Sequence, residues 1–251
     1  HRELEYDDCG LLNYGDFNYN GYNNWLNLEY DTDLALYTHF VRSGDRYAFF
    51  RGVDASRHFL DADMLWYHRD QYRHGYNLQH GAMHHDGSRP KGHTYTAGLP
   101  YYYLLTGDWR GLQCARSISD CIHRYMCARM LVKGTAEKAT QPMAGFQSRG
   151  VNTRNCSAPA RYALLTYQCT GEGRFLDATV DIVEELLNTP ESWLGHGRAY
   201  INYRYPRILH FLYRMTGRDD IRDLLLRASE SAWKYSRERD VERCAVKRMR
   251  M

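Results

Sequence analysis

Apolar positions along the chain recur with the spacing of amphipathic helices, and short glycine-containing motifs separate them into pairs. The motifs are SGD at 43–45, TGD at 106–108, TGE at 170–172 and TGR at 216–218. After the second motif, Leu112, Ala115, Ile118 and Ile122 share one helical face. Gly107 suits the left-handed end of the helix before it, and Asp108 suits the cap of the helix after it. The pattern predicts four helical hairpins.

The hairpins are spaced by roughly 45–65 residues, with long irregular connections between them. Runs of alternating polar and apolar residues are nearly absent, so only short strands, for example around 13–20, are expected. This pattern predicts an all-α fold, an incomplete α/α toroid of about four hairpins, with the long loops gathered at one mouth of the ring. The alternative is an α-solenoid, whose repeats are usually shorter and more uniform.

Composition is that of a soluble globular domain, with 43% hydrophobic and 25% charged residues among 251. We expect a single domain over 1–251. The net charge is +3 and the basic residues are dispersed except near the C-terminus, which argues against nucleic acid as a partner. No run of apolar residues is long enough for a membrane span. The seven cysteines form no CxxC pair, which argues against a zinc finger.

Seven of the twelve histidines fall between His58 and His93, interleaved with Asp, Tyr and Trp. Imidazole titrates near neutral pH and is a common metal ligand, and aromatic rings stack on ring-shaped polar ligands. We therefore predict proton chemistry here, with His80 and His85 as candidate catalytic residues. The alternative is a solvated connection in which the histidines only cap helices and fill space.

Amide and aromatic side chains are mixed in the segment before the first hairpin, GDFNYNGYNNWLNLEYDTD. Amides donate and accept hydrogen bonds while rings stack, a combination that suits sugar hydroxyls. Asn23, Asn24 and Tyr30 are our candidates for substrate binding. The alternative is that the asparagines serve turns and that Asp31 or Thr32 caps the next helix.

A metal site is a further possibility in HFLDADMLWYH, where Asp61, Asp63 and His68 offer oxygen and imidazole ligands to a divalent cation such as Ca²⁺. The two aspartates are two positions apart, so they converge only if the helix ends between them. Otherwise they cap the helix and form salt bridges.

The segment GHTYTAGL places His93 and Tyr95 at the start of a predicted helix. Helix N-termini attract anions, so this pair could neutralise a carboxylate and move a proton. The alternative is that Thr94 caps the helix and that Tyr95 belongs to the core.

Two later segments precede the third and fourth hairpins, where a toroid places residues that line its mouth. Arg is a natural partner of a sugar carboxylate. The candidates are Arg149, Asn152, Arg154 and Asn155 in the first segment, and Trp193, His196, Arg198, Tyr200 and Arg204 in the second.

The order of these motifs resembles the helical catalytic domain of exo-rhamnogalacturonan lyases and their YetA-like relatives. The motifs are GDFNY, NNWLNLEYDTDLAL, ASRHFLDADMLWYH and GHTYTAGLPYYYLLTGD, and the resemblance is best over 13–108. It implies a carbohydrate-active enzyme, secreted or periplasmic, that cleaves a uronate-containing polysaccharide by β-elimination. It also implies that the chain is part of a longer one, without flanking β-domains. The family leads us to expect an acidic residue where this sequence has Ala97.

β-Elimination requires a neutralised uronate carboxylate, a base that removes the C5 proton and an acid that protonates the leaving oxygen. We predict His80 or His85 as the base, Tyr95 as the acid, and His93 with Asn24 or Arg149 at the carboxylate. The predicted substrate-binding residues are Asn23, Asn24, Tyr30, Arg149, Trp193 and His196. Two alternatives stay open: a glycoside hydrolase that pairs Asp61 or Asp86 with Glu29, and a non-catalytic glycan-binding module.

Overall fold

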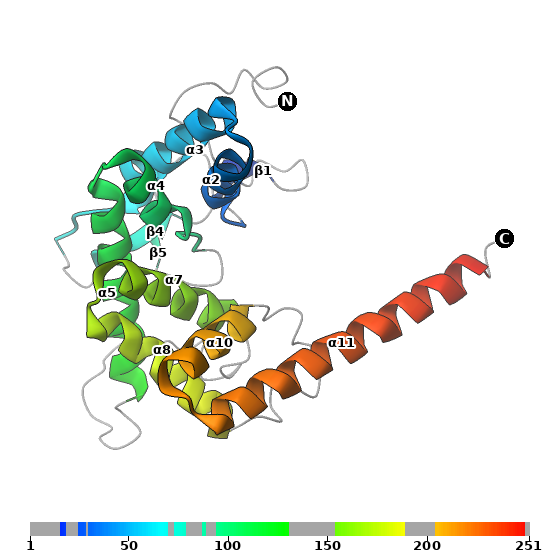
Figure 1. Ribbon diagram of the computed structural model, residues 1–251. Coiled ribbons are helices and arrows are strands. Elements are labelled where there is room, and N and C mark those ends of the chain that lie inside the picture. Colours follow the sequence, from blue (N-terminus) through cyan, green and yellow to red (C-terminus); the bar gives the residue numbers. More distant parts are fainter. Residues whose placement is uncertain are drawn as a thin grey trace.

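Eight α-helices form four hairpins in the part of the chain that the computed structural model describes (Figure 1). The described residues are 16–18, 25–28, 30–69, 73–78, 87–88, 94–130, 154–188 and 204–248. The hairpins pair α2 (Thr32–Ser43) with α3 (Arg46–His58), α4 (Gly98–Thr106) with α5 (Arg110–Met130), α7 (Arg154–Thr170) with α8 (Gly173–Asn188), and α10 (Arg204–Thr216) with α11 (Asp219–Arg248). The predicted hairpins are confirmed.

Strands are short and lie between hairpins or ahead of them. β1 (Asp16–Asn18) pairs with β2 (Trp25–Asn27), which confirms the short strand expected there. β3 (Met64–Leu65), β4 (Tyr76–Leu78) and β5 (Gly87–Ser88) form a second small antiparallel sheet. A short π-helix, η1 (Phe59–Asp63), joins α3 to β3.

Each hairpin turn is built by its own three-residue motif. The turn glycines Gly44, Gly107, Gly171 and Gly217 have φ of 72°, 74°, 71° and 66°. The hydroxyl before each glycine also bridges the turn. Thr106 donates to the carbonyl of Tyr102 at 2.6 Å and accepts the N–H of Asp108 at 3.1 Å. Asp108 in turn accepts the N–H of Arg110 at 3.1 Å, which caps α5 as predicted.

The helices form two layers along an open arc (Figure 1). α2, α4, α7 and α10 lie on the concave side as an inner layer, and α3, α5, α8 and α11 form the outer layer. The far part of α11 extends away from the other helices. This arrangement confirms the α/α toroid. The long connections 131–153 and 189–203, which we expected at one mouth, are not among the described residues.

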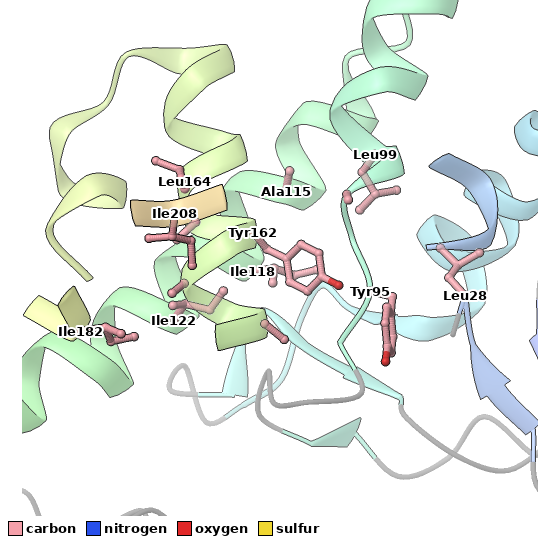
Figure 2. Close-up of a cluster of buried hydrophobic side chains, with 14 of the residues drawn as sticks. Leu28, Tyr95, Leu99, Ala115, Ile118, Ile122, Tyr162, Leu164, Ile182 and Ile208 are labelled. Atoms are coloured by element: carbon pink, nitrogen blue, oxygen red, sulfur yellow. The ribbon is translucent and has the colours of Figure 1, made fainter. Parts of the chain in front are cut away.

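The core lies between the two layers (Figure 2). Three of the four residues expected on one face of α5, Ala115, Ile118 and Ile122, are buried there. They belong to one buried cluster with residues of α7, α8 and α10 such as Leu164 and Ile208. Consecutive hairpins therefore share one continuous core. No helix within the described ranges has the length and apolarity of a membrane span.

Candidate functional site

The N-terminal ends of α2 and α4 meet at one carboxylate, that of Asp31. Its Oδ1 accepts a hydrogen bond from the backbone N–H of Ala97 at 3.2 Å. Its Oδ2 accepts one from Nη1 of Arg161, on α7, at 2.8 Å. Asp31 is 5% exposed and Arg161 is 7% exposed. A buried ion pair with a further hydrogen bond fixes the relative position of the groups that it joins. Three inner helices are thus held together on the side of the arc where α2 and α4 begin, and we call this side the mouth.

Asp31 occupies the N-cap position of α2, but its side chain makes no capping hydrogen bond. The sequence alternative that Asp31 caps this helix is therefore wrong, because both carboxylate oxygens serve the contacts with α4 and α7. Ala97 itself is buried. The carboxylate that we expected at position 97 is absent, and that of Asp31 lies against the backbone there instead.

The backbone before α2 is strained. Leu28, Tyr30 and Asp31 have φ of 44°, 65° and 58°, a left-handed region that residues other than glycine seldom adopt. Leu28 is fully buried and Asp31 is tied to α4 and α7, whereas Tyr30 between them is 65% exposed. Such strain persists only where surrounding contacts enforce it, and it clusters at functional sites. The turn presents the Tyr30 ring at the mouth.

Tyr95 lies behind Tyr30 in the core. Its ring centroid is 5.8 Å from that of Tyr30 and 6.4 Å from that of Tyr162, and its side chain is only 1% exposed. Figure 2 shows its hydroxyl directed away from Leu99. The N-cap position of α4 is Ala97 and not Thr94, whose hydroxyl donates to Oδ1 of Asn77 at 3.1 Å. The alternative that placed Tyr95 in the core therefore describes its position.

A second carboxyl group, that of Asp33, is completely buried in the first turn of α2. It accepts the N–H of Leu34 at 2.8 Å and the hydroxyl of Ser56 at 3.2 Å. Burial, and then the nearby charge of Asp31, raise the pKa of Asp33 to about 7. A Cβ at Gly98 would lie 2.1 Å from Cγ of Asp33, so only glycine fits where α4 crosses α2.

The three candidate metal ligands do not come together. Asp61 is exposed and pairs with Arg110 at 3.1 Å, whereas Asp63 is buried and its Oδ2 lies 3.1 Å from Nε2 of His58. His68 is half-buried on the connection after β3. Among the described residues, no group of three or more His, Cys, Asp and Glu side chains could hold a metal ion. The physical reason is η1, which turns the two aspartates to opposite sides.

Of the candidates before the third and fourth hairpins, Arg154 and Asn155 begin α7 and Arg204 begins α10, whereas Asn152, Arg198 and Tyr200 lie outside the described residues. Other candidates also lie outside the described residues. They are His80, His85, His93, Asn23, Asn24, Arg149, Trp193 and His196, together with Glu29 and Asp86 of the hydrolase alternative.

One comparison with known proteins identifies the family. A family model described as the PcRGLX-like protein C-terminal alpha/alpha toroid domain matches residues 10–227. The chain belongs to this family. At this coarse level the match supports the rhamnogalacturonan-lyase-like resemblance, without singling out the YetA-like relatives. A search of curated proteins and a search of solved structures returned no match.

The sequence analysis did not predict the ion pair between Asp31 and Arg161, which joins the inner helices of this toroid domain. Arg161 lies in the run SAPARYALL, where a charged residue among apolar ones is the only signal of a buried ion pair. Asp33 could be read from the sequence only as a residue of the first helical turn. Its role depends on Ser56 and on Gly98, which are distant in the chain.

Proposed function

We propose that this toroid domain is a polysaccharide lyase that cleaves a uronate-containing, rhamnogalacturonan-like glycan by β-elimination at the mouth. The observation that carries the proposal is the exposed Tyr30 ring, held on a strained turn where α2 and α4 begin. An aromatic ring anchored through the backbone can stack on a sugar ring at little entropic cost, because its position is set before binding. The family match supports the same class of activity.

We assign each step of the chemistry to one of the candidate residues. Tyr30 contacts the sugar, and Tyr95 supports the Tyr30 ring from behind, as their 5.8 Å centroid distance indicates. Because Tyr95 is buried, both proton transfers fall to histidines in this proposal: His80 or His85 removes the C5 proton, and a second histidine of this group protonates the leaving oxygen. His93, with Asn24 or Arg149, neutralises the uronate carboxylate. A secreted or periplasmic location belongs to the same proposal.

One feature of the structure, a pair of carboxyl groups other than those considered from the sequence, is relevant to the hydrolase alternative. Asp31 and Asp33 are neighbouring carboxyl groups, and the pKa of Asp33 is raised to about 7, as in an acid of a glycosidase pair. Both groups face inward, however. Asp33 is fully buried and Asp31 is engaged by Arg161 and by the backbone of Ala97. Neither can reach a glycosidic oxygen from this position, so this pair does not support a hydrolase.

The test compares Tyr30→Ala with a matched control, Tyr47→Ala. Tyr47 lies on α3 and is 62% exposed, close to the 65% of Tyr30. With rhamnogalacturonan as substrate, we expect the absorbance of unsaturated uronate product from the unmodified domain. We expect kcat/KM to fall by about tenfold or more in Tyr30→Ala only, the usual scale for a lost aromatic contact at the reacting sugar.

The other outcomes separate the alternatives. New reducing ends without the absorbance of an unsaturated product would identify a hydrolase. Glycan binding without either product would identify a binding module. Equal rates in Tyr30→Ala and Tyr47→Ala would remove Tyr30 from the mechanism.

A further inference from the structure

The inner helix α10 carries a row of basic side chains on its exposed face. Arg207, His210 and Arg214 are all exposed. Because residues three and four apart are neighbours on a helix surface, these side chains form one row along α10, which we call the α10 stripe. The opposite face of the helix is buried in the core, and it consists of Tyr205, Ile208, Leu209 and Leu212.

The buried face fixes the direction of the α10 stripe. α10 packs against its inner-layer neighbour α7 and against α11 of the outer layer. Phe211, partly buried beside the stripe, packs its ring edge-on against that of Tyr167 on α7, with centroids 6.5 Å apart. Since the core lies between the two layers, the stripe on the opposite face of α10 points away from the outer layer and toward the concave side of the arc (Figure 1).

The positive charge of the α10 stripe has no local counter-charge. α10 contains no Asp or Glu, and no side-chain hydrogen bond or ion pair joins the stripe to any residue in the described ranges. Arginines of the outer layer differ in this respect. Arg116 on α5 pairs with Glu172 at 2.6 Å, and Arg174 on α8 pairs with Asp120 at 2.9 Å. The guanidinium groups of the stripe therefore keep their donors available, and basic side chains gathered on one face attract anions.

The spacing of the α10 stripe suits a chain of sugars. Seven residues separate Arg207 from Arg214, a rise of roughly 10 Å along the helix. This rise is close to the length of a disaccharide, so the two guanidinium groups can bind carboxylates on alternate sugars, each in bidentate fashion. His210 lies between them, where its ring nitrogens can form hydrogen bonds with hydroxyl groups of the intervening sugar.

We propose that the α10 stripe is a binding subsite for an acidic saccharide chain on the concave side of the arc. Arg207 and Arg214 bind carboxylates of alternate sugars, and His210 contacts the sugar between them. That this chain is the glycan to be cleaved rests on the proposed function, whereas carboxylate recognition rests on the stripe itself. The stripe includes no residue assigned above to sugar stacking or proton transfer.

The test measures binding of two probes by calorimetry: a rhamnogalacturonan hexasaccharide and its carboxyl-reduced form, which is neutral. The absorbance of unsaturated product is recorded in parallel, so that cleavage is followed separately from binding. The variant Arg207→Gln/Arg214→Gln is compared with Arg46→Gln/Lys234→Gln, which removes the same charge from the outer layer. Arg46 begins α3 and Lys234 lies on α11, and both are exposed.

The stripe variant is expected to raise the Kd of the acidic probe about fivefold or more, because two ion pairs with the ligand are lost. The control variant is expected to stay within about twofold, because its charges lie on the far layer and are screened by salt. The neutral probe should bind both variants equally. Arg207→Lys/Arg214→Lys, which keeps the charge and loses the bidentate geometry, should bind the acidic probe with intermediate affinity.

Three results would overturn the subsite: no binding of the acidic probe by the unmodified domain, equal Kd values in the stripe and control variants, or an equal loss of affinity for the neutral probe. Because the substituted side chains are exposed, equal thermal midpoints are expected and check the fold. If no unsaturated product forms but the stripe variant still loses affinity, the proposed lyase activity fails and the subsite stands. If product forms and the affinities are equal, the subsite fails and the lyase stands.

Discussion

Replacing Asp33 by Asn tests the buried carboxyl group between α2 and α4. Asn has nearly the same shape: its amide oxygen can accept the N–H of Leu34, and its amide NH2, in place of the second carboxylate oxygen, can donate to the hydroxyl of Ser56. It cannot ionise. The change therefore removes the cost of holding a carboxylate in a fully buried site and leaves the packing against Gly98 in place.

The sign and the size follow from the pKa. Asp33 has a pKa of about 7 in the folded protein against an ordinary value of 3.8, so the folded state holds the proton more tightly than the unfolded state. Asp33 therefore makes stability fall as pH rises from about 4 to 7, and the loss is complete above pH 7. At about 1.4 kcal/mol per pKa unit, the full cost is roughly 4 kcal/mol, and roughly 2–3 kcal/mol of it falls between pH 5 and pH 8.

Urea denaturation of both proteins at pH 5 and pH 8 measures this cost. The difference in unfolding free energy between Asp33→Asn and the unmodified domain should shift in favour of Asn by roughly 2–3 kcal/mol at pH 8 relative to pH 5. Comparing differences cancels the other titrating groups. A difference that does not change with pH would refute the raised pKa, and so would an NMR titration of the Asp33 carboxyl near its ordinary value.

Three further predictions test the packing, Tyr95 and metal dependence. Gly98→Ala should destabilise the domain by about 2 kcal/mol or more, because its Cβ would overlap Asp33, whereas Gly173→Ala, with nothing within 4 Å, should be neutral or stabilising in urea denaturation. Similar effects in both would contradict the close packing. Tyr95→Phe should keep turnover within about threefold, since a lost general acid costs on the order of a hundredfold or more, and such a loss would restore Tyr95 as the acid. Chelator treatment should leave Tm unchanged; a fall in Tm that Ca²⁺ reverses would establish a metal site.

The helical hairpins and their turns could be predicted from the sequence because their causes are local. Each turn uses a hydroxyl, a glycine and hydrogen bonds within four residues, as the contacts of Thr106 with Tyr102 and Asp108 show. The apolar face of α5 follows from helical spacing in the same way. The toroid then follows from repetition, since successive hairpins can bury their apolar faces only against one another.

The site depended on the tertiary structure because its contacts join residues far apart in the chain. Asp31 and Arg161 are separated by 130 positions, and no local pattern relates them. Tyr95 is in the core because the Tyr30 and Tyr162 rings lie beside it. Asp61 and Asp63 diverge because a π-helix lies where the sequence was compatible with a simple helix end. Burial, charge pairing and the pKa of Asp33 depend on the residues that the rest of the fold brings close. The sequence by itself therefore determined the repeating helical hairpins, and only the packed structure decided which polar groups meet at the mouth.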